Sequence, residues 1–256
     1  MNKFSNLLTG LVLAGFTSSA MAADLPARVA TPVQPYVAAP VANWTGFYVG
    51  GGGGYGLYDA ESSSVFASIP GTNGTTGGKG WFGTVQVGGD LQFWGNWVAG
   101  VFGDWDFASI KGTLLDANSN GRYGLKETSA WAVGGRVGYL ITPQILSYFT
   151  GGYAAAQFKG ATGGCATPAV PAACPAAVIT LPKSDYTGYF LGGGTEVLLG
   201  FAPGWSVKTE YRLAQYSAQT VAFTSAPAIP GGATATIKPV VQTICSELVY
   251  KFNWGR

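Results

Sequence analysis

The sequence predicts an all-β protein, an eight-stranded antiparallel transmembrane β-barrel preceded by a cleaved signal peptide and a Pro/Ala-rich linker. Several segments alternate apolar and polar residues with a period of two, the pattern of strands with one lipid-facing and one interior face. Glycine is abundant, with 40 residues, whereas charged residues make up only 10% of the chain. After the leader, no segment has the roughly 18 consecutive apolar residues of a membrane-spanning helix.

The first 43 residues are predicted to lie outside the barrel. Residues 1–22 have the positive start, the apolar centre and the small-x-small site Ala20-Met21-Ala22 of a secretory signal peptide, with a retained anchor as the alternative. Residues 23–43 carry four prolines among alanines and valines, which predicts an extended periplasmic linker. That linker is interpreted as a simple spacer, with peptidoglycan contact as the alternative.

Residues 43–58 are predicted to form the first strand, because apolar odd positions alternate with glycines. Inside a bilayer every backbone N–H and C=O must be paired, so a spanning strand requires a closed barrel. Gly51, Gly53 and Gly56 also satisfy G-x-G-x-x-G. The dinucleotide interpretation is disfavoured because loop-forming residues follow, where that motif requires a helix.

The barrel is predicted to occupy residues 44–254, with short turns alternating with long loops. Both chain ends then lie on the short-turn side, which is periplasmic in outer-membrane barrels. The facing of the fifth strand is ambiguous from sequence. The other predicted strands are 80–93, 97–107, 125–140, 145–158, 185–199, 205–216 and a last one ending near 254. The predicted turns are 94–96, the residues around Pro143, and 201–204; the predicted long loops are 59–79, 111–124, 159–183 and 217–238.

Strand alternation places ten charged side chains in the predicted interior. An eight-stranded barrel is just wide enough to hold its own side chains. Buried charges persist when they are paired and hydrogen-bonded. We therefore expect a salt-bridged plug, with a narrow ion path as the alternative. The ten residues are Asp90, Asp104, Asp106, Arg136, Glu196, Lys208, Glu210, Arg212, Glu247 and Lys251.

Three cysteines are present. Cys165 and Cys174 lie in one predicted Pro/Ala-rich loop, and in an oxidising compartment this spacing predicts a disulfide that rigidifies the loop. Cys245 lies in the last strand and is interpreted as a small inward-facing side chain.

The composition argues against several classes of function. The formal net charge of +2 makes nucleic acid an unfavoured partner. The chain has no histidine, so a base that titrates near neutral pH is absent and no enzymatic activity is expected. No cofactor is predicted. A haem receptor is the less favoured alternative, because its axial ligand would have to be a cysteine or a tyrosine such as Tyr58 or Tyr123.

Four short segments together carry a family resemblance: WTGFYVGG at 44–51, WAVGGRVGY at 131–139, YFTGG at 148–152 and WSVKTEY at 205–211. With ADLP at 23–26, they resemble the alphaproteobacterial outer-membrane β-barrel proteins, small surface barrels often labelled porin-family proteins. The resemblance implies an eight-stranded barrel of the bacterial outer membrane. Members are described as surface antigens and envelope-integrity proteins, and some as haem binders.

The resemblance also implies an assembly signal at the C-terminus, read by the barrel-assembly machinery. Such chains usually end in an aromatic residue, whereas here Phe252 is followed by four more residues. The candidate aromatics are Tyr250, Phe252 and Trp254, and the sequence leaves open whether Phe252 or Trp254 is read.

The favoured function is therefore that of a structural surface barrel that contributes to envelope integrity, with its interior plugged by charged side chains. Porin-like diffusion of small solutes or ions is the alternative. The expected partners are outer-membrane lipid, lipopolysaccharide and the barrel-assembly machinery; the sequence does not indicate an oligomeric state.

Overall fold

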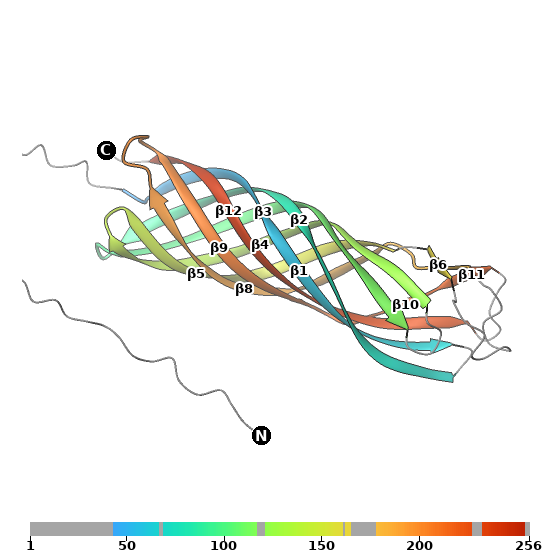
Figure 1. The fold of residues 1–256 in the computed structure, drawn as a ribbon. Coiled ribbons are helices and arrows are strands. Elements are labelled where there is room, and N and C mark those ends of the chain that lie inside the picture. The colour runs from blue at the N-terminus through green and yellow to red at the C-terminus, as the bar shows by residue number, and fades with distance from the viewer. Residues whose placement is uncertain are drawn as a thin grey trace, which may run out of the picture. The chain divides into compact units, whose positions relative to one another are not determined.

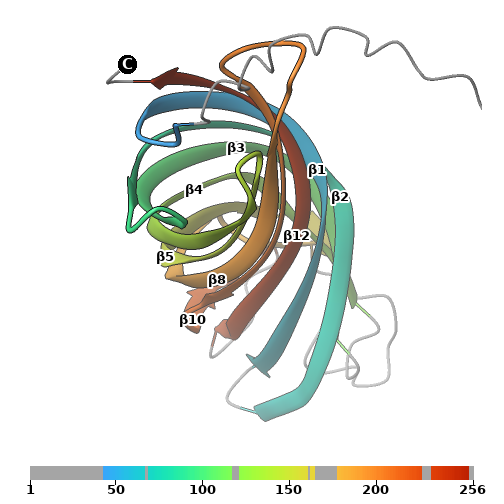
Figure 2. The same ribbon diagram turned by 90° about the vertical axis from the view of Figure 1, so that its left-hand side faces the viewer.

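Eight long antiparallel strands close into a barrel in the computed structural model (Figures 1 and 2), which confirms the predicted fold class. β1 pairs with β2 on one side and with β12 on the other, and this second pairing closes the sheet. The strands, in the order in which they pair, are β1 (Gly46–Phe66), β2 (Ile69–Phe93), β3 (Trp97–Asp116), β4 (Gly121–Thr142), β5 (Ile145–Gly160), β8 (Ser184–Leu198), β9 (Trp205–Tyr216) and β12 (Ala233–Asn253).

The structure describes residues 43–66, 69–116, 121–160, 162–164, 178–226 and 232–253. Within these ranges no helix is long and apolar enough to cross a membrane. The predicted signal peptide, the predicted linker up to residue 42, the predicted disulfide between Cys165 and Cys174, and Trp254 lie outside the described residues.

The two ends of the barrel differ. One end, here the turn end, carries the short connections at 94–96, 143–144 and 199–204, and there Gly46 pairs with Asn253. The opposite, loop end carries four short strands, of which β6, β10 and β11 are labelled in Figure 1. β10 (Gln219–Ala222) pairs with β12, while β6 (Thr162–Gly164), β7 (Val178–Thr180) and β11 (Thr224–Ala226) form a separate small sheet.

Two belts of aromatic side chains surround the outer wall, and valines and leucines lie between them. On β1, β3 and β4 the belts are eight residues apart, as from Trp97 to Trp105. At about 3.3 Å per residue and a tilt of about 40°, this separation is about 20 Å, which suits the apolar core of an outer membrane. The turn-end belt comprises Phe47, Trp97, Tyr139, Trp205, Tyr250 and Phe252, and the loop-end belt comprises Tyr55, Trp81, Trp105, Trp131, Tyr153 and Tyr189.

The facing of β5, ambiguous in the sequence, is settled by the structure. Tyr148, Thr150 and Phe158 are buried inside the barrel, whereas Phe149 and Tyr153 are exposed on its outer wall. The even-numbered residues of this strand therefore face the lumen, and β5 alternates like its neighbours.

The prediction of long loops at 59–79 and 111–124 was wrong for most of their length, and that of a loop at 217–238 was wrong for its last six residues. β1 continues to Phe66, β2 already begins at Ile69, and β12 begins at Ala233. Glycine, serine and threonine dominate these stretches and indicated loops. The strand ladders nevertheless continue, because beyond the belt the barrel still encloses apolar side chains such as Tyr58 and Ile237.

Inward-facing glycines provide the space for large lumen side chains. A Cβ added to Gly78 would lie 2.1 Å from the Tyr58 ring, and one added to Gly112 would lie 2.2 Å from the Tyr58 hydroxyl oxygen. Tyr58 is fully buried, and its hydroxyl donates to the Leu125 carbonyl oxygen at 3.1 Å. These two glycines therefore form the seat of the Tyr58 ring.

Gly112→Ala is expected to lower the free energy of unfolding by about 1–3 kcal/mol, because the new methyl group overlaps the Tyr58 hydroxyl. The measurement is the urea concentration at which half of the protein has moved from the folded to the unfolded band on a gel. In the Tyr58→Phe background the hydroxyl is absent, so the same substitution should cost less, and the cost that remains comes from the Gly77 carbonyl oxygen, 2.6 Å from the new Cβ. Equal costs in both backgrounds would rule out the overlap as the cause.

Candidate functional site

A closed ring of four alternating charges crosses the lumen near the turn end. Arg136 donates from Nε to Asp90 Oδ1 at 2.8 Å and from Nη1 to Glu196 Oε2 at 3.0 Å. Lys251 Nζ completes the ring, at 3.0 Å from Asp90 Oδ2 and 3.1 Å from Glu196 Oε1. All four side chains are almost completely buried. The four residues come from β2, β4, β8 and β12, every second strand of the barrel, and we name them the four-charge ring.

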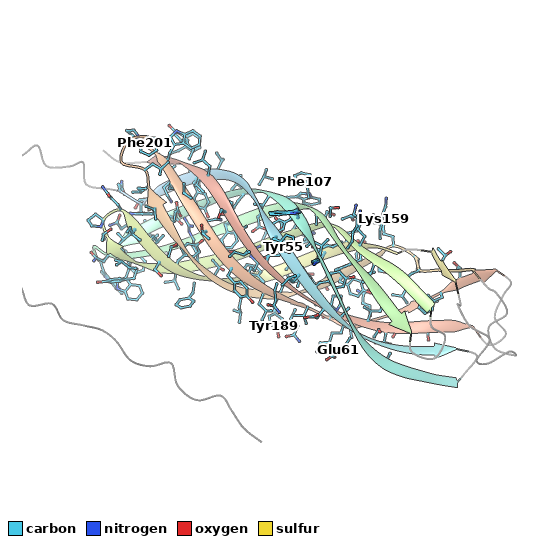
Figure 3. The ribbon with its side chains drawn as sticks, viewed as in Figure 1. Tyr55, Glu61, Phe107, Lys159, Tyr189 and Phe201 are labelled. Atoms are coloured by element: carbon cyan, nitrogen blue, oxygen red, sulfur yellow. The ribbon has the colours of Figure 1, made fainter. Side chains whose placement is uncertain are left out.

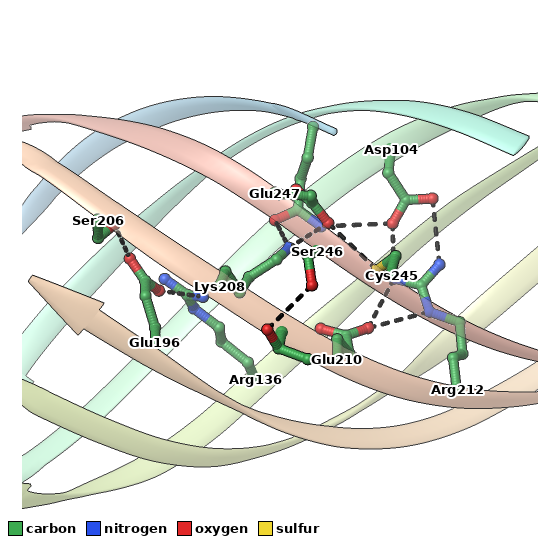
Figure 4. A network of polar contacts seen from close by, with 12 residues as sticks. Asp104, Arg136, Glu196, Ser206, Lys208, Glu210, Arg212, Cys245, Ser246 and Glu247 are labelled. Atoms are coloured by element: carbon green, nitrogen blue, oxygen red, sulfur yellow. Dashed lines mark hydrogen bonds and ion pairs between the residues drawn. The ribbon is translucent and has the colours of Figure 1, made fainter. Parts of the chain in front are cut away.

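The four-charge ring is held by neutral groups around it. The Ser206 hydroxyl donates to Glu196 Oε1 at 2.7 Å (Figure 4). The Arg136 guanidinium lies 4.6 Å from the centre of the Tyr48 ring and 5.3 Å from that of the Tyr148 ring. These contacts add cation–π attraction to the ion pairs and leave little space beside the guanidinium.

A second group of charges continues the network toward the loop end (Figure 4). Lys208 Nζ lies 2.8 Å from Glu247 Oε1 and donates to Gln86 Oε1 at 2.5 Å. The Gln86 amide nitrogen in turn approaches Asp104 Oδ2 at 3.5 Å. Gln86 thus connects the Lys208–Glu247 pair to the next ion pair of the lumen.

Arg212 is the centre of that next group, which also contains Asp104 and Glu210 and is here called the Arg212 group. Its Nη2 lies 2.8 Å from Asp104 Oδ2 and 2.9 Å from Glu210 Oε1. The guanidinium also lies 4.5 Å from the centre of the Phe190 ring, and the Tyr148 hydroxyl donates to Glu210 Oε2 at 3.1 Å. An arginine held by two carboxylates and stacked on an aromatic ring fills the bore as a fixed group.

The turn end of the lumen is closed by Trp44, which precedes β1. Its side chain is 1% exposed, and its Nε1 donates to the Pro143 carbonyl oxygen across the barrel mouth at 3.1 Å. Lys251 Nζ lies 4.6 Å from the Trp44 ring, and the backbone N–H of Trp44 donates to Gln92 Oε1. We name this arrangement the Trp44 cap.

The loop end of the lumen is filled by apolar side chains. Tyr58, Phe158 and Tyr186 meet edge to face, with ring centres 6.0 Å and 5.4 Å apart. Ile110 and Leu125 are buried against the same cluster. These five residues, here the apolar plug, lie beyond the loop-end belt, so the filling of the lumen continues outside the membrane-spanning part.

A small cavity remains between the ion pairs and the apolar plug. Its volume is about 20 Å³, and its lining includes Asp106, Glu127 and several alanines. Such a volume holds about one water molecule and no hydrated ion. Among the described residues, no group of three or more His, Cys, Asp or Glu side chains is arranged to hold a metal ion.

The structure places all ten predicted lumen charges inside the barrel and brings nine of them into ion pairs. Asp106 is the exception: it lines the small cavity and makes no ion pair with a described residue. Cys245 faces inward with a free thiol, 3.6 Å from Glu247 Oε1. Of the predicted assembly aromatics, Tyr250 and Phe252 pack together on the outer wall at the turn end.

Sequence reasoning missed one lumen acid and several neutral lumen residues. Glu127 is 3% exposed, and its Oε2 has no hydrogen-bond partner among the described residues. Thr128 is an extra residue in the pairing of β4 with β5, and this bulge reverses the facing of the residues before it. Strict alternation along β4 therefore assigns Glu127 to the wrong face. The neutral lumen residues that were missed are Trp44, Tyr48 and Tyr148.

The haem alternative depended on accessible tyrosines. Tyr58 is fully buried in the apolar plug, and its hydroxyl is already bonded to the Leu125 carbonyl oxygen. It therefore offers no open axial ligand. The side chain of the other candidate, Tyr123, lies outside the described residues.

The chain is similar in sequence to the "31 kDa outer-membrane immunogenic protein" of Brucella melitensis. The two are 31% identical over 222 residues, which cover 80% of this chain and 85% of that protein. The protein of the same name from Brucella suis matches to the same extent. The chain belongs to the family of these outer-membrane immunogenic proteins. This membership confirms the predicted resemblance to alphaproteobacterial outer-membrane barrels, and no general family model matches the chain.

A solved structure supports the same architecture for this chain. The outer membrane protein OprG of Pseudomonas aeruginosa superposes with a TM-score of 0.54, covering 82% of this chain and 98% of OprG. At 13% sequence identity, this likeness concerns the fold alone. Sequence and fold together identify the chain as a surface protein of the bacterial outer membrane.

Proposed function

We propose that the protein is a closed structural barrel of the cell surface that contributes to envelope integrity and is neither a pore nor an enzyme. The observation that carries this proposal is the continuous filling of the lumen. The Trp44 cap, the four-charge ring, the Arg212 group and the apolar plug follow one another from end to end. The cavity of about 20 Å³ between them is too small for a solute path.

The proposed orientation has the turn end in the periplasm and the loop end outside. Short turns face the periplasm in bacterial outer-membrane barrels. Both described chain ends lie at the turn end, since Gly46 pairs with Asn253. The predicted linker would then reach toward the cell wall, and Tyr250 and Phe252 would be available on the outer wall for recognition by the assembly machinery.

The refolded mature protein is expected to show no stable openings in planar lipid bilayers. Arg212→Ala should produce flickering conductance, because it removes a side chain that lies 4.5 Å from Phe190 and between two carboxylates. The measurement is single-channel recording of both proteins at equal amounts.

Lys238→Ala is the matched control, since it removes one positive charge from the strand wall where Lys238 pairs in register with Glu61. It should remain silent. Stable, discrete openings of the unmodified protein would overturn the closed barrel and favour the porin alternative.

A further inference from the structure

Four lysines on neighbouring strands lie directly opposite one another on the outer wall. Lys79 of β2 is in register with Lys111 of β3. Lys111 is in register with Lys126 of β4, and Lys126 with Lys159 of β5. Each of these lysines is next to an inward-facing residue in its strand, and neighbouring residues of a strand point to opposite faces. All four lysine side chains therefore point away from the lumen. We name these four residues the lysine row.

The lysine row is a continuous line of four positive charges across four neighbouring strands. Like charges directly opposite each other destabilise a sheet, because their Cβ atoms are only about 4.5–5.5 Å apart. None of the four lysines forms an ion pair with another residue in the part of the chain that the structure describes. Two exposed acids lie near the ends of the row on the outer wall: Asp59 of β1 is in register with Gly77, two residues from Lys79, and Asp185 of β8 is in register with Gln157, two residues from Lys159. Asp185 accepts a hydrogen bond from Gln157, and Glu127 is buried in the lumen.

The lysine row lies just beyond the loop-end belt. Lys79 is two residues beyond Trp81, and Lys159 is six residues beyond Tyr153. With about 3.3 Å per residue and a tilt of about 40°, the row extends from about 5 Å to about 15 Å beyond the aromatic belt. Figure 3 shows Lys159 farther toward the loop end than Phe107. This is the depth of the polar headgroups of a membrane leaflet.

A fifth lysine continues the line of charge. Lys183 is exposed and directly precedes Ser184, which pairs with Phe158 next to Lys159. The positive charge therefore extends across the outer wall from β2 to the start of β8 with no acid in the row itself.

We propose that the lysine row binds the phosphate groups of lipopolysaccharide in the outer leaflet. Lysine ammonium groups bind phosphate as point charges, and several phosphates within this range of depths would offset the repulsion along the row. The exposed Trp81 and Phe107 lie below the row, where they contact the acyl chains of the same lipid. This inference depends on the proposed orientation, in which the loop end is outside.

The test compares the mature protein with the variant K79Q/K111Q/K126Q/K159Q, both folded in a mild detergent. Without lipopolysaccharide, the variant should be at least as stable to heat as the unmodified protein, because the repulsion is removed. Adding purified lipopolysaccharide should raise the melting midpoint of the unmodified protein and leave that of the variant almost unchanged. The apparent affinity should fall at least tenfold in the variant, and high salt should abolish the difference.

Three further variants test charge and position separately. Changing all four lysines to arginine should retain lipopolysaccharide binding, because the positive charge is kept. Lys111→Gln should weaken it several-fold, whereas Lys238→Gln, which removes one charge from β12, should not. Equal weakening by these two single variants would overturn the assignment to the row.

The ligand source is distinguished by the choice of probe. Lipopolysaccharide stripped of its phosphates and inorganic phosphate alone should leave the melting midpoint unchanged. A soluble sulfated polysaccharide that stabilises as strongly as lipopolysaccharide would overturn the proposal in favour of a general polyanion surface. Bilayer conductance does not depend on the row, so a failure here is separate from a failure of the closed-barrel function.

Discussion

Arg136→Ala is expected to lower the free energy of unfolding by about 3–5 kcal/mol, among the largest effects of any single substitution in this barrel. The change leaves the buried carboxylates of Asp90 and Glu196 with Lys251 as their one remaining ion-pair partner among the described residues. It also removes the guanidinium that lies against Tyr48 and Tyr148. Urea unfolding of the refolded protein in detergent, followed by tryptophan fluorescence and gel mobility, measures the loss.

The cost of Arg136→Ala should come from stranded carboxylates rather than from lost volume. A variant that replaces the whole four-charge ring with apolar residues of similar size should therefore recover much of the stability, because no buried charge is left unpaired. Lys238→Ala on the outer wall should change the free energy of unfolding by less than about 1 kcal/mol. If Arg136→Ala cost no more than Lys238→Ala, the ring would not stabilise the barrel.

Trp44→Ala is expected to cost a similar amount, about 3–5 kcal/mol, because it empties a fully buried site at the turn end. The change removes the hydrogen bond to the Pro143 carbonyl oxygen and the aromatic face beneath Lys251. Trp44→Phe keeps an aromatic ring near Lys251 but loses the indole N–H, so its cost should be about 1–2 kcal/mol. The same urea unfolding measures both variants.

Trp94→Ala is the matched control for the Trp44 cap. Trp94 belongs to the β2–β3 turn at the same end of the barrel, but its side chain is 87% exposed. Removing it should change the free energy of unfolding in detergent by less than about 1 kcal/mol. Similar losses for Trp44→Ala and Trp94→Ala would mean that the cap is an interfacial anchor and does not close the lumen.

Most of the barrel architecture was predictable because residues that alternate with a period of two point alternately to the lumen and to the outer wall. Asp90 and Asp104, for example, point into the lumen in both the prediction and the structure. The lengths of the strands were not predictable. Beyond the membrane the outer wall meets water, so outward-facing residues are no longer apolar and the alternation is harder to see in the sequence. There, only buried apolar side chains such as Ile110 and Ile237 show that the paired strands continue.

The inward charges of the lumen were predictable, but their partners were not. Asp90 and Arg136 are 46 residues apart in the chain, and Asp90 and Lys251 are 161 apart. They meet because closure brings β2, β4 and β12 around one narrow bore, and the relative stagger of the strands decides which charges share a level. Glu127 shows that even the inward or outward direction of a charge can be missed, because the extra residue Thr128 reverses the facing of the residues before it in β4.

The origin of the four-charge ring has a consequence for how the barrel assembles. Lys251 belongs to β12, the last strand of the chain, and β12 is also the strand that joins β1 to close the sheet. Without β12, Asp90, Arg136 and Glu196 would carry a net charge of −1 inside an open sheet. β12 both supplies Lys251 and pairs with β1 to close the sheet, so ionic balance and closure depend on the same strand. An open-sided intermediate is thereby disfavoured twice, once by its unpaired backbone and once by its unmatched carboxylate.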